Sequence, residues 1–201
     1  DNNVEPTEKV LSTAFACDFE DGSLEDFEIQ DTVWKVKDNA LVYSGGDYTY
    51  NSTLTKNAYN ITEKSVLTFD AQFLDVEGKG AYKSFEISVT KDGENLTWIG
   101  TCASIYDPSI GEYGGYSAEF ESYRVDLGAK FAEMELEYGE YRLVWQYLSY
   151  SEGVTSIDNI ELSERAWVYP AGDYYLVAAA SESFKLTVKS DALPELELNK
   201  E

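Results

Sequence analysis

The 201-residue sequence contains no histidine, one methionine, two cysteines and four prolines. Histidine is the commonest general base and the usual neutral ligand of zinc, so its absence excludes Ser-His-Asp, Cys-His and zinc-hydrolase sites. Any catalysis would have to rely on carboxylates. The sequence also lacks an apolar run long enough to cross a bilayer, and we expect no membrane insertion of this segment.

Basic residues are scarce as well. Lys and Arg number 15 against 38 Asp and Glu, which gives a formal net charge of −23. Such a surface repels nucleic-acid backbones and anionic lipid headgroups, so neither is an expected partner.

Aromatic residues are abundant, with 16 Tyr, 9 Phe and 4 Trp. This composition is typical of secreted β-sandwiches and of proteins that contact sugars or other surfaces. The polar start at residues 1–6 (DNNVEP) is typical of a mature terminus after removal of an export signal. We therefore expect an exported protein, secreted or at the cell surface.

Short runs of β-branched and aromatic residues, separated by Gly, Asp and Asn, predict an all-β fold, an antiparallel β-sandwich. The clearest run is 141–147, in which Tyr141, Leu143, Trp145 and Tyr147 alternate with Arg142, Val144 and Gln146. A similar alternation along the predicted strand 96–105 predicts that Trp98 lies in the core. Residues 129–134 are at best a short helix or a turn. The predicted strands are residues 14–19, 27–30, 34–37, 40–43, 65–74, 84–90, 96–105, 120–126, 140–150 and 156–161.

The domain organisation follows from these runs. We expect a mobile leader at 1–12, the sandwich at 13–162 and an acidic, disordered tail at 191–201. Residues 163–190 are a hairpin that either docks on the sandwich or is a fragment of a following module, because two strands cannot bury a core. Cys17 and Cys102 form no Cys-x-x-Cys unit, and the sequence leaves open whether they form a disulfide.

Carboxylates gather in two distant segments, 17–22 (CDFEDG) and 155–162 (TSIDNIEL). If both are strands, Asp18 and Glu20 share one face, and Asp158 stands among apolar residues. Neither segment contains Lys or Arg, so a cation such as Ca²⁺ would relieve the repulsion. The alternative is that these acids point to solvent.

The order of several motifs resembles the bacterial jelly-roll family of choice-of-anchor and cleaved-adhesin domains, which is related in shape to MAM domains and carbohydrate-binding modules. The motifs are 19–22 (FEDG) followed by Phe27, 34–41 (WKVKDNAL), 43–46 (YSGG), 139–145 (GEYRLVW) and 157–160 (IDNI). The resemblance covers about residues 14–162 and leaves out the hairpin and an insertion at 105–119.

The resemblance implies a sandwich of jelly-roll type with Trp34 and Trp145 in the core. It also implies a structural calcium ion bound by Glu20 and Asp158, with Asp18 as a weaker ligand. Backbone carbonyls near residues 46–47 would complete the site.

Tyrosines mark two loops. The insertion carries Tyr106, Tyr113 and Tyr116 among glycines, and Tyr48 and Tyr50 follow a Gly-Gly turn that Tyr43 and Tyr59 also flank. Tyrosine mixed with Gly, Ser and Asp is typical of recognition surfaces, because the ring offers a large contact at low entropic cost. These tyrosines are candidate ligand-binding residues; half-buried structural tyrosines are the alternative.

We therefore predict a noncatalytic exported module that binds carbohydrate or mediates adhesion. One alternative is a sandwich-fold glycoside hydrolase that uses Glu133 and Glu137, since 133–137 (EMELE) read as a strand puts its acids on one face about 6.5–7 Å apart. Another is a structural subunit of a surface complex that contacts protein.

Overall fold

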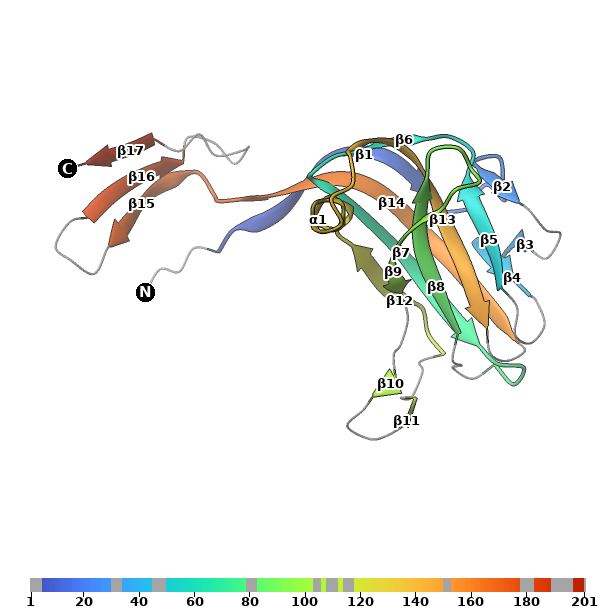
Figure 1. Cartoon of the computed structure of the whole chain (residues 1–201). Helices are drawn as coiled ribbons and strands as arrows, with labels where there is room; N and C mark the ends of the chain where they lie inside the picture. The colour runs from blue at the N-terminus through green and yellow to red at the C-terminus, as the bar shows by residue number, and fades with distance from the viewer. Residues whose placement is uncertain are drawn as a thin grey trace. The chain divides into compact units, whose positions relative to one another are not determined.

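The computed structural model describes residues 5–29, 34–44, 50–78, 83–102, 106–107, 112–113, 118–149, 153–177, 183–188 and 197–200 (Figure 1). The chain forms two compact units. The sandwich unit is Thr13–Ser163, and the terminal unit combines Asp1–Ser12 with Glu164–Glu201.

The first sheet of the sandwich, sheet A, has the strand order β12-β7-β14-β4-β3, and β1 also pairs with β14. Its longest strand, β14, lies between β7 and β4 in this order. The strands are β1 (Thr7–Cys17), β3 (Trp34–Lys37), β4 (Ala40–Tyr43), β7 (Ser65–Leu74), β12 (Glu121–Val125) and β14 (Val154–Val168).

The second sheet, sheet B, has the order β2-β5-β13-β8-β9, with β6 also paired to β13. Every neighbouring pair in it is antiparallel. Its strands are β2 (Phe27–Ile29), β5 (Tyr50–Thr55), β6 (Tyr59–Ile61), β8 (Lys83–Thr90), β9 (Thr97–Cys102) and β13 (Gly139–Ser149).

An aromatic core joins the two sheets. Tyr43 of sheet A packs on Tyr147 of sheet B with ring centroids 4.1 Å apart, and Trp34 stacks on Phe85 at 6.3 Å. Trp145 is fully buried in the same cluster. The structure confirms the predicted antiparallel β-sandwich of jelly-roll type, the alternation along 141–147, and the core positions of Trp34 and Trp145.

Shorter elements complete the sandwich unit. Helix α1 (Leu127–Glu133) buries Leu127 and Phe131 against the core, where the sequence predicted a short helix or turn. β10 (Tyr106–Asp107) pairs with β11 (Glu112–Tyr113) in a separate two-stranded sheet. No helix in the described part of the chain is long and apolar enough to cross a membrane.

The terminal unit contains a three-stranded sheet of β15 (Gly172–Val177), β16 (Ser183–Val188) and β17 (Glu197–Lys200). Its residues 197–200 pair with β16, although the sequence predicted a disordered tail there. Likewise β1 begins at Thr7, inside the predicted mobile leader. β1 pairs with β14, far along the chain, and β17 pairs with the preceding strand β16; composition reveals neither pairing.

Candidate functional site

Two of the acidic residues predicted to bind calcium, Asp18 and Glu20, lie near enough to the third, Asp158, to repel it electrostatically. Asp158 lies on β14, whereas Asp18 and Glu20 follow the end of β1. Burial raises the pKa of Asp158, and repulsion from Asp70, Asp18 and Glu20 raises it further. Asp70, on β7, was not predicted, because nothing in its local sequence connects it with the other three.

Hydrogen bonds already engage several of these carboxylates. Asn159 has a left-handed backbone conformation with φ of 48° in the middle of β14. Its side-chain amide donates to Asp70 Oδ2 at 2.8 Å, and its backbone N–H donates to Asp158 Oδ1 at 2.7 Å. Glu20 accepts a hydrogen bond from Asn39 Nδ2 at 2.8 Å.

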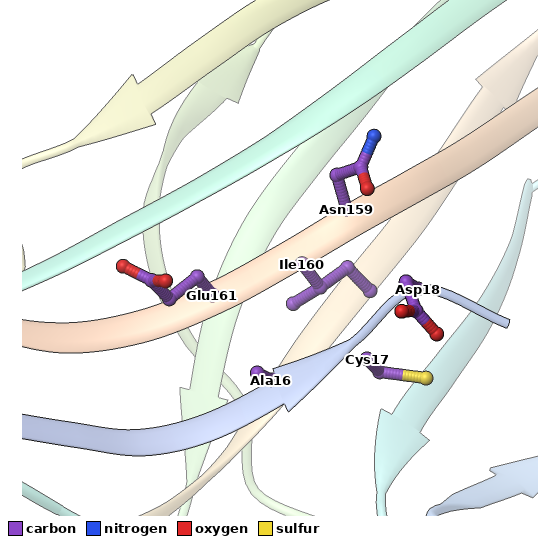
Figure 2. A pocket seen from close by; sticks show the side chains of 6 residues that line it. All are labelled: Ala16, Cys17, Asp18, Asn159, Ile160 and Glu161. Atoms are coloured by element: carbon purple, nitrogen blue, oxygen red, sulfur yellow. The ribbon is translucent and has the colours of Figure 1, made fainter. Parts of the chain in front are cut away.

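A pocket of about 250 Å³ lies between the end of β1 and β14. Figure 2 shows Cys17 and Asp18 from β1 and the loop after it, opposite Ile160 of β14, with the carboxylates of Asp18 and Glu161 pointing away from each other. Cys17 is a free thiol whose pKa is raised mainly by burial. Among the residues that the structure describes, no three His, Cys, Asp or Glu side chains are grouped closely enough to hold a metal ion.

The predicted tyrosines are only partly described. Tyr106 and Tyr113 face each other in the backbone register of β10 and β11, and Tyr50 pairs with Leu148 in sheet B. Tyr48 and Tyr116 lie outside the described residues.

Tyr43 and Tyr59, the other two tyrosines that the sequence placed near Tyr48 and Tyr50, have structural roles. Tyr43 belongs to the core, and Tyr59 stacks on Phe15 with ring centroids 4.9 Å apart.

The proposed catalytic pair does not have the geometry that the sequence suggested. Glu133 is the last residue of α1 and accepts a hydrogen bond from Lys130 Nζ at 2.9 Å. Glu137 follows in a segment without regular secondary structure, with its Oε2 3.9 Å from Lys91 Nζ. Glu135 between them has φ of 56°. The interpretation of 133–137 as a strand is therefore wrong, because the chain turns at Glu135 to bring Leu136 against the core.

Trp98 is exposed, which corrects the prediction that it lies in the core. Its exposed fraction is 53%, whereas the next residue on β9, Ile99, is 2% exposed and packs in the core. The register between β8 and β9 shifts at Ile87/Ser88. This bulge changes which residues of β9 face inward, and a strict two-residue alternation cannot anticipate it.

Trp98 stands at one end of a row of residues on the side of sheet B that faces away from the core, which we call the outer face. The register aligns Trp98 with Ser88, Ser88 with Val144, Val144 with Leu54, and Leu54 with Glu28. Four strand spacings give this row a length of about 19 Å. Its three middle residues, Ser88, Val144 and Leu54, are buried, and Trp98 and Glu28 at its ends are exposed. A second row, beside the first, contains Glu86, Gln146 and Ser52.

Hydrogen bonds fix the polar side chains of the outer face. The buried Ser88 hydroxyl donates to Gln146 Oε1 at 2.7 Å. Arg142 extends from β13 across β5 to β2, where its Nη2 donates to Glu28 Oε2 at 2.6 Å, and its Nε donates to the carbonyl of Thr55 at 2.6 Å. The outer face thus carries an exposed indole at one end and, at the other, an exposed carboxylate that a guanidinium holds in place, whereas the Ser88–Gln146 pair is buried. In the sequence, this face was indicated by Arg142, Val144 and Gln146, which alternate with the apolar residues of 141–147.

Comparison with known proteins found no matching family model and no matching curated protein. Solved structures with a similar arrangement include a tandem CBM22 domain of Xyn10C from Paenibacillus barcinonensis, with 12% identity, a TM-score of 0.46, 76% coverage of this chain and 50% of that one. TmCBM61, in complex with β-1,4-galactotriose, has 13% identity, a TM-score of 0.46 and coverages of 73% and 94%. CBM29_1, a family 29 carbohydrate-binding module from Piromyces equi, has 16% identity, a TM-score of 0.44 and coverages of 79% and 91%.

Proposed function

We propose that this chain is a noncatalytic carbohydrate-binding module that acts outside the cell, and that it binds its glycan on the outer face of sheet B. The observation that carries the proposal is the exposed Trp98 at one end of the outer face, with the exposed carboxylate of Glu28, held by Arg142, at the other end. An exposed indole offers a flat apolar surface on which the C–H face of a sugar ring stacks, and polar groups beside it bind the ring hydroxyls.

Preorganisation supports the same function. Glu28, the exposed carboxylate of this face, is held by Arg142 Nη2 at 2.6 Å, so little side-chain freedom would be lost when a glycan binds. The three solved structures compared above are carbohydrate-binding modules, but their similarity is too low to carry the proposal, which rests on residues of this chain.

The predicted tyrosines belong to the proposal as additional contacts. Tyr50 is two residues before Ser52 on β5, and Tyr106, Tyr113, Tyr116 and Tyr48 are candidates from the loops. Glycan binding at a cell surface would also serve adhesion. A protein partner at that surface is the alternative, and it predicts no affinity for any polysaccharide.

The structural calcium ion stays a prediction. Its support is the concentration of negative charge around Asp158 and the oxygen-only donors, which suit Ca²⁺. The described carboxylates do not converge on one point, and Glu20 already accepts a hydrogen bond from Asn39. Calcium binding would therefore require side-chain movement, and no step of glycan binding depends on it.

The test is binding of the whole chain to a panel of soluble polysaccharides by affinity electrophoresis, followed by titration calorimetry. Removing a stacked indole forfeits about 1.5–3 kcal/mol, so Trp98→Ala should bind about tenfold to hundredfold more weakly than the wild type. The matched control is Trp167→Ala, because Trp167 is 62% exposed but belongs to the terminal unit.

Equal losses of glycan affinity in Trp98→Ala and Trp167→Ala would show that Trp98 does not contact the glycan. Absence of binding to every polysaccharide would contradict the proposal. The same polymers are also assayed for new reducing ends. Their release, abolished by Glu133→Gln, would instead support the hydrolase alternative.

A further inference from the structure

The outer face of sheet B is predominantly negative. Among the strand residues of this sheet whose side chains are described, the charged ones on the outer face are Glu28, Glu86, Glu140 and Arg142. Lys56, which follows β5, adds one cation at the margin. Even with Lys56 included, three carboxylates face two cations.

The central cation on this face is not available to an anionic ligand. Arg142 uses Nε for the carbonyl of Thr55 and Nη2 for Glu28, and its Nη1 lies against Gly93. Its side chain is 15% exposed. A ligand carboxylate would have to displace Glu28, which already satisfies the guanidinium at 2.6 Å.

We propose that the glycan bound on this face is uncharged, a neutral polysaccharide rather than one that carries uronic acid, sulfate or phosphate groups. This inference rests on the proposed function and narrows its ligand class. Arg142 is then a positioning residue: it holds Glu28 in place, and the exposed carboxylate of Glu28 is free to accept hydrogen bonds from sugar hydroxyls. The net charge of −23 acts in the same direction, since it repels polyanions before contact.

The experiment uses polymers that share a backbone and differ in charge. The whole chain is titrated with hydroxyethyl cellulose and carboxymethyl cellulose, with dextran and dextran sulfate, and with galactan and polygalacturonate. Within any pair that binds, we expect the neutral polymer to bind at least about tenfold more tightly at low ionic strength, and the difference to shrink as salt screens the repulsion.

Two variants with the same change in charge test the role of Arg142. Glu28→Gln releases the guanidinium on the outer face, and we expect the preference for the neutral polymer to narrow by about two- to fivefold, the range of a partly exposed ion pair. Glu63→Gln removes one exposed negative charge from the turn before β7 and should leave the preference unchanged.

The outcomes separate the two proposals. A charged polymer that binds as tightly as its neutral counterpart overturns the inference but leaves carbohydrate binding intact. No binding to any polymer overturns both. If Glu28→Gln prefers the neutral polymer over the charged one as strongly as the wild type does, the positioning role of Arg142 is overturned.

Discussion

The guanidinium of Arg142 occupies the space that a side chain at position 93 would need. A Cβ atom added to Gly93 would lie 2.7 Å from Arg142 Nη1, and Gly93 also has φ of +83°. Arg142 could move aside only by giving up its hydrogen bonds to Thr55 and Glu28. The turn between β8 and β9 and the polar centre of the outer face are therefore coupled through these two residues.

Gly93→Ala should lower both stability and glycan affinity. The left-handed backbone alone costs about 1–2 kcal/mol with a Cβ atom, and displacing Arg142 adds the loss of a charged hydrogen bond, about 1.5 kcal/mol or more. Gly22→Ala is the control, because Gly22 has φ of +71° but no atom within 4 Å of the added Cβ. Urea unfolding measures both free energies, and equal losses would show that the contact with Arg142 contributes nothing.

Asp158 should make the protein less stable as the pH rises. Its pKa is raised above the ordinary 3.8 by burial and by the neighbouring acids, so the folded state binds this proton more tightly than the unfolded state. The stabilisation is fully present below pH 3.8 and is lost as the pH rises through the raised pKa.

Asp158→Asn lacks this charge and should be more stable than the wild type at pH 7 in the presence of a chelator. The difference should vanish toward pH 3.8 in thermal melts. Glu94→Gln, which removes an exposed carboxylate, is the control and should show no such trend. A less stable Asp158→Asn at pH 7 would mean that the ionised carboxylate is stabilising.

In excess Ca²⁺ the wild type should become more stable than Asp158→Asn. An ion that binds only the folded state raises its stability by about 2.7 kcal/mol at one hundred times the dissociation constant. We expect excess Ca²⁺ to raise the melting temperature of the wild type, a chelator to lower it again, and Asp158→Asn to respond to neither. If Ca²⁺ leaves the wild-type melt unchanged, Asp18, Glu20 and Asp158 are ordinary carboxylates.

The Ser88–Gln146 hydrogen bond should matter more when one partner is lost than when both are. Ser88→Ala leaves the buried Gln146 carbonyl without this donor, which costs about 1–3 kcal/mol of unfolding free energy. Ser88→Ala combined with Gln146→Leu removes both polar partners and should recover part of that loss. A double variant that is no more stable than Ser88→Ala alone would contradict this interpretation.

Strand positions were largely predictable because alternation is a local property. The run 141–147 carries its pattern in seven consecutive residues, and the structure places its apolar side in the core. The limits of β1 and the turn at Glu135 were not predictable, because pairing with β14 decides the first and docking of Leu136 the second.

The amino-acid sequence by itself determined the excluded chemistries, the acidic surface and the all-β class, since each depends on composition or on short-range periodicity. It also selected the acids at 18, 20 and 158, which the fold brings near one another. Only the tertiary structure decided that Asp70 joins them and that Arg142 meets Glu28, 114 residues away in the chain. Only the register shift beside Ile87 turned Trp98 outward, because strand register is fixed by pairing between distant segments.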